Sequence, residues 1–300
     1  MVPAGLVLIN KPKDITSFSA LYPIKKTIYK KVGHTGTLDR FAEGLLIALI
    51  GPMTRMNSYF TDYDKVYEAI FRFGIGTATL DPEGKIIAEG PIPTRNDIVR
   101  VIPEFIGKIE QIPPKFSAIH VNGVRAYKSA LAGKELELQS RPIDIFSFEV
   151  ICYTPPDLTV RIHCSKGTYI RSLARDLGKR LSTCAYVTSL CRTKIGPFEL
   201  IDAVDPNNAT LYDLITPWDI FNRLGTISSA VIEDPLYVEK IGHGHLLERT
   251  WCESLHLVED SKLCAIFTPD KRLLGVVKSE VKDGKISFVK YKFIISEDQG

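Results

Sequence analysis

The feature that most constrains the fold is a short apolar run, Leu45–Ile50, which lies between Gly44 and Gly51. Such a run is too short for a stable helix, so it predicts a central, buried strand. Directly before it comes a polar, glycine-rich stretch, 33–39, which reads Gly-His-Thr-Gly-Thr-Leu-Asp. Its two glycines permit a tight turn or a close approach of the backbone to a ligand. Polar groups at the edge of a core are typical of a functional site, and we expect one here.

The rest of the chain alternates between strand and helix periods, with turns marked by glycine and proline. Because many neighbouring strands are joined by turns, we predict an α+β fold with a large mixed, mostly antiparallel sheet flanked by helices. In the first helix, Pro23 should cause a kink or a late start. Strands are expected at 5–10, 45–50, 65–73, 143–152, 158–164 and 187–195, and helices after Thr16 or Ser17, after Thr94 and at 170–181.

Two regions depart from this pattern. The segment 115–142 mixes polar and apolar residues around a short helix expected near 125–132. Its length fits either a mobile lid or substrate clamp, or a plain surface insertion. After a helical connector expected at 204–222, short strand patterns with a hairpin turn at Thr268–Asp270 predict a small β-rich domain. We therefore divide the chain into a first domain, 1–225, and a second, 226–300.

The composition is that of an ordinary globular protein, with 45% hydrophobic and 24% charged residues. No apolar run reaches the length of a membrane span, and the N-terminus lacks the pattern of a signal peptide. The six cysteines are scattered and form no C-x-x-C pair. This arrangement favours reduced thiols in a cytoplasmic protein over disulfides or a metal site.

Charge is distributed unevenly, although the net charge is only +3. Residues 11–40 hold seven Lys or Arg and two acids, and residues 161–194 hold eight Lys or Arg and one acid. Residues 231–265 instead hold three Lys or Arg and seven acids. The two basic blocks would attract phosphate groups, while a solvated charged face is the simpler alternative for each of them.

Four side chains are candidates for chemistry. A catalytic Asp39 needs a cation to keep it ionised in a dry site, and Arg171, in the first turn of its helix, is the best supplier. Tyr67 lies on a strand beside Lys65 and would stack on a base if the cleft binds RNA. His34 suits a proton shuttle, a metal ligand or a wedge into nucleic acid. The simpler alternatives are a capping Asp39, a solvated Arg171 and a core Tyr67.

Several common sites are not predicted. His34 is not accompanied by the spacing of a zinc site, so we expect no metal. Neither G-x-x-x-x-G-K-[ST] nor G-x-G-x-x-G occurs, which argues against nucleotide hydrolysis and NAD chemistry.

Six motifs in one order make the chain resemble the TruB family of pseudouridine synthases. The stretch 33–39, with Ala42, Gly44 and Leu46 behind it, is similar to the catalytic motif of that family. The resemblance covers roughly residues 5–220. The other motifs are Asn10-Lys11-Pro12, Asp64-Lys65-x-Tyr67, Gln111-x-Pro113-Pro114-x-x-Ser117-Ala118 with Arg141-Pro142, Cys164 to Leu173 (CSKGTYIRSL), and Leu190-x-Arg192-Thr193-x-x-Gly196-Pro197-Phe198.

The resemblance implies the pseudouridine synthase fold and a role for each matching residue. Asp39 is the catalytic carboxylate, Arg171 pairs with it, and Tyr67 stacks on the flipped uracil and takes a proton from the sugar C2′. Five substrate-binding residues are implied as well. His34 fills the hole left in the RNA stack, and Leu190 packs on the base. Lys11 and Tyr169 shape the pocket, and Arg141 lies at the edge of the RNA-gripping insertion, 115–142. The isomerisation conserves all atoms, so no cofactor is expected.

The chain departs from the family pattern next to the catalytic residue. Arg40 stands where the family usually has proline, which loosens the backbone there and adds a phosphate contact. The second domain only weakly resembles the RNA-binding PUA type, and its acidic balance argues against a strong grip on RNA.

The resemblance implies a bacterial-type enzyme that forms pseudouridine at position 55 in the T arm of tRNA. Two alternatives are a guide-RNA-dependent enzyme of the dyskerin type, and a tRNA-binding folding chaperone without catalysis. The long insertion argues against the first, and the set of Asp39, Tyr67 and Arg171 argues against the second. No heptad pattern is present, so a monomer is expected.

Overall fold

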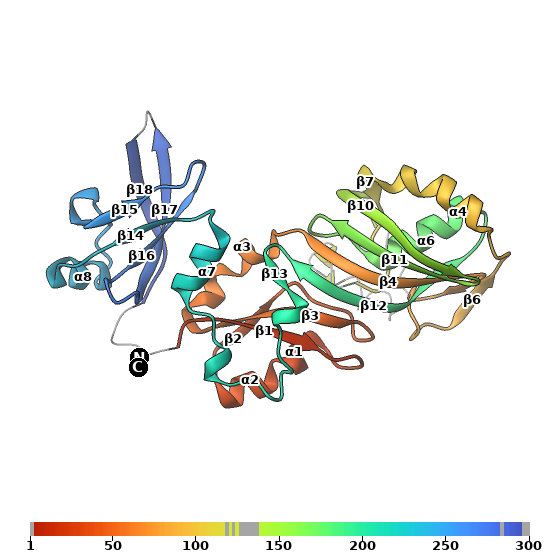
Figure 1. The fold of residues 1–300 in the computed structure, drawn as a ribbon, viewed down its shortest axis with the longest axis horizontal. Coiled ribbons are helices and arrows are strands. Elements are labelled where there is room, and N and C mark those ends of the chain that lie inside the picture. The colour runs from red at the N-terminus through yellow and green to blue at the C-terminus, as the bar shows by residue number, and fades with distance from the viewer. Residues whose placement is uncertain (1–2, 118–119, 122–123, 126–137, 283–284, 296–300) are drawn as a thin grey trace.

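The computed structural model describes residues 3–117, 120–121, 124–125, 138–282 and 285–295. Within them, nine strands form one large sheet in the order β1-β3-β12-β4-β11-β10-β7, with β2 beside β3 and β13 beside β12. Of these pairs only β12 and β3 run parallel, so the predicted mixed, mostly antiparallel sheet is confirmed (Figure 1). The strands are β1 (Gly5–Lys11), β2 (Val32–Thr35), β3 (Glu43–Ile50), β4 (Lys65–Phe73), β7 (Gly107–Gln111), β10 (Arg141–Thr154), β11 (Asp157–Cys164), β12 (Ala185–Ile195) and β13 (Phe198–Glu199).

The apolar run Leu45–Ile50 lies within β3, where every residue from Gly44 to Ile50 is buried. It is hydrogen-bonded to β1 along its whole length and meets β12 at Gly44. On β4, alternate residues are buried, as expected from the period-2 pattern of 65–73. A small separate hairpin, β5 (Ile75–Thr77) and β6 (Ile86–Glu89), follows β4.

The helices expected after Thr16 or Ser17, after Thr94 and at 170–181 are present and begin where the sequence predicts. Thr16 caps α1 (Ser17–Ala20), the helix breaks at Leu21, and Pro23 lies in the first turn of α2 (Tyr22–Thr27), which is the expected break. Thr94 caps α4, and the apolar stripe of α6 is buried against the sheet. The remaining helices of this part are the 3-10 helix Gly51–Met56, α3 (Asn57–Thr61), α4 (Arg95–Val101) with the 3-10 helix Ile102–Phe105, and α6 (Ile170–Arg180).

The predicted helical connector at 204–222 is wrong for most of its length. Only α7 (Pro217–Leu224) is an α-helix there, after 3-10 turns at Leu200–Asp202 and Leu211–Asp213. The extended backbone at Val204 and Ile215 pairs with β1, with bridges to Ile9 and Leu6. The edge of β1 offers unpaired backbone groups, so hydrogen bonding along that edge is favoured over a helix.

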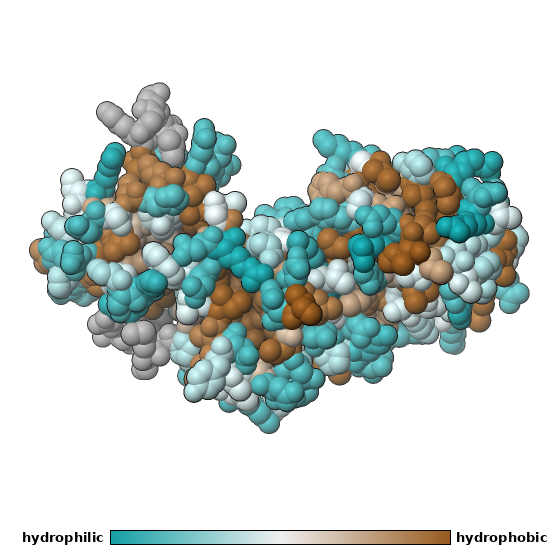
Figure 2. Space-filling model, in the orientation of Figure 1, coloured by the Kyte–Doolittle hydropathy of each residue, from teal (hydrophilic) through white to brown (hydrophobic). Residues whose placement is uncertain are grey.

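A second sheet follows in the order β15-β14-β16-β17-β18, and the expected turn at 268–270 joins β16 to β17. Its elements are β14 (Ser228–Val231), α8 (Pro235–Gly242), the 3-10 helix Arg249–Trp251, β15 (Ser254–His256), β16 (Leu263–Phe267), β17 (Leu273–Lys282) and β18 (Lys285–Ile294). Figure 2 shows this lobe beside the larger one, with a notch between them at one edge.

The two lobes share a continuous apolar core. Met53 and Phe60 from the first lobe and Phe221 of α7 pack in one cluster with Phe267 and Phe293 of the second sheet. The ring of Phe267 meets the rings of Trp218 and Phe221 with centroids 5.1 and 6.0 Å apart. None of the helices in the described ranges has the length and apolarity to cross a membrane.

Candidate active site

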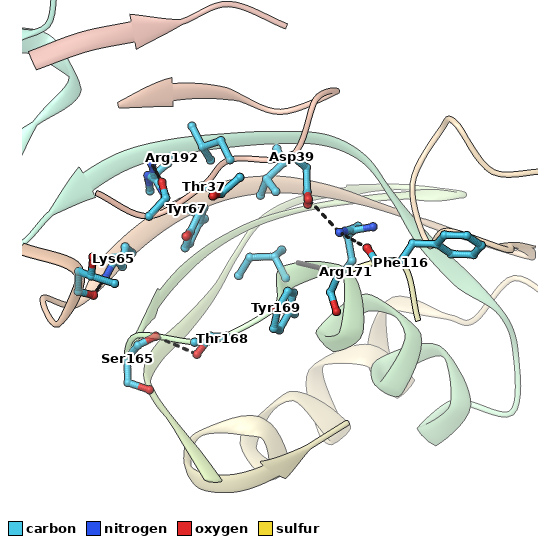
Figure 3. Close-up of a pocket in the computed structure, with 17 residues that line it drawn as sticks. Thr37, Asp39, Lys65, Tyr67, Phe116, Ser165, Thr168, Tyr169, Arg171 and Arg192 are labelled. Atoms are coloured by element: carbon cyan, nitrogen blue, oxygen red, sulfur yellow. Dashed lines mark hydrogen bonds and ion pairs between the residues drawn. The ribbon is translucent and has the colours of Figure 1, made fainter. Parts of the chain in front are cut away.

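A cavity of about 530 Å³ lies over the middle of the large sheet, where five separate segments meet. Its walls come from the loop after β2, the start of β4, Phe116 and Ser117, the loop into α6, and β12. Figure 3 shows Asp39 and Arg171 pointing toward one another, with Tyr67 and Tyr169 on the surrounding walls. Segments far apart in the sequence therefore build a single site.

The loop that carries Asp39 is fixed by hydrogen bonds from both sides. The Ser17 hydroxyl donates to the Leu38 carbonyl at 3.1 Å and accepts from the Leu38 N–H at 2.9 Å. The buried Lys11 ammonium donates to the Arg40 carbonyl at 3.3 Å, and the Asp14 N–H donates to the same carbonyl at 2.9 Å. The backbone of this loop is thus held immediately before and after Asp39.

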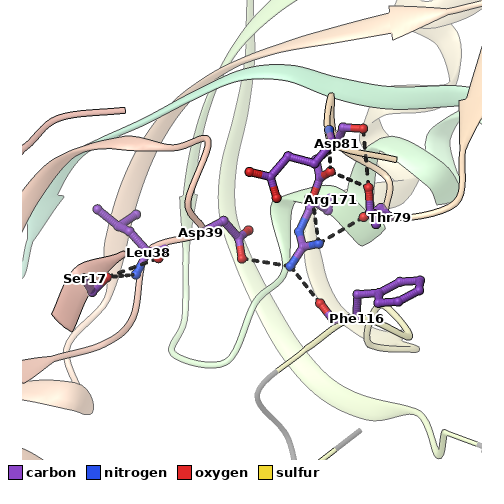
Figure 4. A network of polar contacts seen from close by, with 8 residues as sticks. Ser17, Leu38, Asp39, Thr79, Asp81, Phe116 and Arg171 are labelled. Atoms are coloured by element: carbon purple, nitrogen blue, oxygen red, sulfur yellow. Dashed lines mark hydrogen bonds and ion pairs between the residues drawn. The ribbon is translucent and has the colours of Figure 1, made fainter. Parts of the chain in front are cut away.

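Arg171 lies beside Asp39, with its Nη2 2.8 Å from Asp39 Oδ1. Its side chain is 5% exposed, whereas that of Asp39 is 34% exposed toward the cavity. The guanidinium has further partners: Nη1 donates to Asp81 Oδ2 and to the Thr79 carbonyl, both at 3.0 Å, and Nη2 donates to the Phe116 carbonyl at 3.1 Å (Figure 4). One cation is therefore shared by two carboxylates, of which only Asp39 faces the cavity to any extent.

The environment of Asp39 acts on its charge in both directions. Burial raises the pKa of Asp39 above its usual value, and the charge of Asp81 adds to this rise. The guanidinium of Arg171 and the ammonium of Lys11 oppose it by stabilising the ionised form. A carboxylate whose ionised form is stabilised by a fixed cation in a confined site is suited to nucleophilic attack.

The wall of the cavity opposite α6 is formed by Tyr67, Leu190 and Arg192. Tyr67 on β4 and Leu190 on β12 are 9% and 4% exposed, and Arg192 lies opposite Tyr67 in the sheet register. The Arg192 side chain is 1% exposed, and it donates to the Leu45 carbonyl at 2.8 Å and the Gly36 carbonyl at 3.0 Å. Burial raises the pKa of Tyr67, and Arg192 opposes this shift. Tyr67 is therefore a neutral phenol at neutral pH.

Tyr169 enters the cavity from the segment just before α6. Its backbone N–H donates to Gln111 Oε1 at 2.8 Å, and its carbonyl accepts from Gln111 Nε2 at 3.1 Å. This double contact connects the end of β7, and so the base of the insertion, to the start of the helix that carries Arg171. Most of the predicted insertion, including the helix expected near 125–132, lies outside the described residues.

Three predicted site residues lie away from the cavity wall. His34 is on β2, where its carbonyl accepts from Asn57 Nδ2 at 3.1 Å, and burial lowers the pKa of its imidazole. Lys11 is fully buried beneath the loop that carries Asp39, and burial lowers its pKa to about 8. Arg141 is exposed at the start of β10, opposite Gln111. Asp39, Tyr67, Tyr169, Arg171 and Leu190 all line the cavity.

Two charged residues of this site, Asp81 and Arg192, are not among those predicted from the sequence. No local pattern in the sequence signals the contact of Asp81 with Arg171. Arg192 had a usable signal, because it follows Leu190 by two residues and so lies on the same face of the predicted strand. In the described part of the chain, no group of three or more potential metal ligands is found.

Comparison with known proteins gives consistent matches. Residues 25–170 match the model of the TruB family pseudouridylate synthase N-terminal domain. The tRNA pseudouridine synthase B of Borreliella burgdorferi (strain ATCC 35210) is 47% identical over 71% of this chain and 77% of its own. That of Treponema denticola is 35% identical over 98% of this chain and 86% of its own.

Two solved structures are similar in fold. An H/ACA RNP bound to a substrate RNA containing 2′-deoxyuridine aligns with a TM-score of 0.69 at 22% identity, covering 98% of this chain and 86% of the matched chain. A Cbf5-Nop10-Gar1 complex aligns with a TM-score of 0.67 at 23% identity, covering 97% and 85%. At these identities the likeness shows the shared fold, with both the large sheet and the second sheet included.

Proposed function

This chain belongs to the TruB family of pseudouridine synthases, and we propose that its target is the uridine at position 55 in the T arm of tRNA. It is an isomerase that forms pseudouridine in tRNA, the activity named for relatives that are 45% to 48% identical. The motifs that carry the resemblance to the family support the finer assignment of position 55.

The chemistry that we propose begins at Asp39. The carboxylate attacks the target nucleotide, at the sugar or at the base, and the N1–C1′ bond breaks. The uracil turns, a C5–C1′ bond forms, and the bond to Asp39 breaks, which regenerates the free carboxylate. C5 loses its proton and N1 gains one, so the product is an isomer of the substrate. No oxidant, reductant or cofactor enters this balance. The observation that carries the proposal is the 2.8 Å ion pair between Asp39 and the buried Arg171 in the wall of the cavity.

The remaining wall residues suit a flipped base. An enzyme that acts on a base inside a stacked RNA must extrude it, and the extruded base is then read by stacking and edge contacts. We assign Tyr67 to stacking on the uracil, Leu190 and Tyr169 to packing around it, and Arg171 to orienting Asp39. The raised pKa of Tyr67 opposes its second implied role, removal of a proton from the sugar C2′.

The residues outside the cavity take supporting parts in the proposal. His34 fills the hole that the flipped base leaves in the stack, Lys11 fixes the catalytic loop, and Arg141 contacts RNA at the base of the insertion. We assign catalysis to residues 1–225 and a PUA-like role to residues 226–300. We also propose that the enzyme acts as a cytoplasmic monomer on the T arm without a guide RNA.

A guide-dependent enzyme and a folding chaperone remain the competing proposals. The named relatives at 47% identity are tRNA enzymes, whereas the H/ACA structures resemble this chain at 22% to 23% identity, which speaks for fold alone. A catalytically silent chaperone has no need of an ion pair between Asp39 and a buried cation. The identity to tRNA enzymes and the ion pair of Asp39 therefore both favour an enzyme that acts alone on tRNA.

One assay tests the proposal. Purified protein is incubated with an unmodified T-arm hairpin, and pseudouridine is mapped along the RNA. We expect product at position 55 with the wild-type protein and none with Asp39→Asn, which keeps the shape of the side chain but removes its charge. Hairpin binding should survive in Asp39→Asn, because phosphate contacts supply most of the affinity. Product from Asp39→Ala, or product only when a guide RNA is added, would sink the proposal.

A further inference from the structure

Two aromatic side chains project into solvent from the first helices. Phe18 of α1 is 68% exposed and Tyr22 of α2 is 60% exposed, although large aromatic groups are normally buried. The core contacts of these helices come from other residues, among them Leu21 and Ile24. Phe18 and Tyr22 are therefore not needed to attach the helices to the sheet.

A lysine lies over each of these rings. The Nζ of Lys25 is 4.2 Å from the centroid of the Phe18 ring, and the Nζ of Lys26 is 4.5 Å from that of Tyr22. A cation at this distance over a ring face is attracted by the quadrupole of the ring, which restricts an otherwise flexible side chain. We call Phe18, Tyr22, Lys25 and Lys26 the aromatic–lysine surface.

The positive charge of this surface is not neutralised by neighbouring acids. Lys30 and Lys31, just beyond α2, are exposed as well. Among the described residues, none of these four lysines has a carboxylate within ion-pair distance, whereas Lys13 on the neighbouring loop pairs with Glu43 at 3.2 Å. The surface thus offers several free cations to an anionic partner.

Helix α1, which carries Phe18, is attached to the loop that carries Asp39. Ser17, which precedes Phe18, is buried and makes both hydrogen bonds to the backbone of Leu38, next to Asp39. A ligand bound on the aromatic–lysine surface is therefore held in a fixed position relative to the site.

We propose that the aromatic–lysine surface is a binding site for the RNA strand of the tRNA substrate, outside the catalytic cavity. The ammonium groups contact phosphates, and the exposed rings stack on an unpaired base or a ribose face. RNA is the partner that supplies both complements, negative charge and flat faces, in one strand. Holding the lysines over the rings before binding reduces the entropy lost when the contacts form. This inference rests on the proposed function, because it takes tRNA as the substrate.

The test of the lysines is the salt dependence of binding to an unmodified tRNA transcript. Each lost phosphate contact lowers the slope of log K against log salt by about 1, so Lys25→Gln/Lys26→Gln should lower it by about 2 and weaken binding roughly tenfold. Lys179→Gln removes one exposed charge from α6, far along the large sheet from α1 and α2 (Figure 1), and should leave the slope unchanged. A wild-type slope in the double lysine variant would overturn the proposal.

The rings are tested separately with Phe18→Leu/Tyr22→Leu, which keeps the apolar character and every lysine. Since stacking of one base contributes about 1–3 kcal/mol, we expect the Kd for tRNA to rise about tenfold while the salt slope stays unchanged. An unchanged Kd would contradict the stacking role.

The single-turnover rate at saturating enzyme should match wild type in all variants, and a rate loss at saturation would also overturn the proposal. Absence of pseudouridine with wild-type protein would instead refute the proposed function, because the binding measurements do not depend on catalysis.

Discussion

Arg171 places one buried cation between two carboxylates, Asp39 at 2.8 Å and Asp81 at 3.0 Å. Its Nη atoms also donate to two backbone carbonyls, so the plane of the guanidinium is fixed before any substrate binds. Such a fixed group stabilises charge in a reaction without the cost of reorganising during it. We therefore expect Asp81 to act through Arg171 as a positioning residue.

Arg171→Ala should lower catalysis much more than binding. We expect kcat to fall by about 10²–10³-fold, as when a fixed charge-stabilising group is removed, while the Kd for the hairpin changes little.

The substitution Arg171→Ala also removes the cation that opposes the rise in the pKa of Asp39. In the proposed mechanism the ionised carboxylate is the active form, so activity should be lost at a higher pH on the acidic side than in wild type. Single-turnover rates across pH measure both effects, with Arg171→Lys as the charge-conserving control. An equal loss in kcat and binding would contradict this role.

Asp81→Asn should have the opposite effect on the pH dependence of the rate: the pH below which activity is lost should move to a lower value. The negative charge of Asp81 raises the pKa of Asp39, so its removal lets Asp39 stay ionised at lower pH. The rate should also fall, since Arg171 loses the ion pair that fixes its Nη1. The measurement is the pH dependence of kcat. If the pH at which kcat is lost on the acidic side rises, or stays unchanged, the result would argue against the sharing of Arg171 by Asp39 and Asp81.

Arg40 shows how the chain manages without the proline that the family usually has at this position. Its carbonyl accepts from Lys11 and from the Asp14 N–H, and its own Nε donates to the Asp14 carbonyl at 2.9 Å. These contacts restrain the backbone after Asp39 by hydrogen bonding instead of by a ring. The rigidity that seemed doubtful from the sequence thus has a tertiary source.

At the scale of elements, the parallel pairing of β3 and β12 determines how the site is assembled. Gly44 lies opposite Arg192 in the parallel pair, with φ +107° and with the Arg192 carbonyl only 2.4 Å from where a Cβ would stand. Only glycine accepts both the backbone conformation and the close approach. The contact brings the strand that carries Leu190 and Arg192 against the loop that carries Asp39.

Gly44→Ala should therefore destabilise the whole protein. We expect a loss of about 2 kcal/mol or more, because the new methyl group meets backbone atoms that cannot move aside and the positive φ is strained. Gly242→Ala is the matched control, since nothing lies within 4 Å of the added Cβ at the end of α8. Urea unfolding of both variants checks the prediction. Equal midpoints for Gly44→Ala and wild type would show that the pairing of β3 with β12 tolerates a side chain at this position.

At the scale of the whole molecule, the core shared by the two lobes bears on the proposed division at 225/226. Phe267 is 1% exposed and belongs to the second sheet, but its nearest rings are Trp218 and Phe221 of α7. Removing the second sheet would expose the apolar side of α7 and of Met53 and Phe60. We therefore expect the lobes to unfold together, even though each has its own sheet.

Phe267→Ala tests this coupling. A buried phenylalanine replaced by alanine costs about 3–5 kcal/mol, and we expect one unfolding transition, shifted as a whole to lower temperature. Leu236→Ala, a 53% exposed residue of the same lobe, should change little. Calorimetry with a probe in each lobe distinguishes the outcomes. Two separate transitions, with only the smaller one shifted, would mean that the lobes are independent.

Charge in the second lobe is more divided than the acidic balance of 231–265 suggests. The following segment, 271–292, which includes β17 and β18, holds seven Lys or Arg and two acids. The hairpin is therefore basic while the preceding part of the lobe is acidic. An average over one segment was too coarse to argue against RNA contact for the whole lobe.

The sequence alone determined the α+β class, the strands β3 and β4, the capped starts of α1 and α4, and the stretch around Asp39. These depend on local periodicity, on proline and glycine, and on motifs that are contiguous in the chain. Only the tertiary structure decided that Arg171 lies between Asp39 and Asp81, which precede it by 132 and 90 residues. It also decided that Arg192 supports the loop and that 204–215 covers the edge of β1. No local pattern encodes which distant polar groups meet, because that depends on how the sheet brings its strands together.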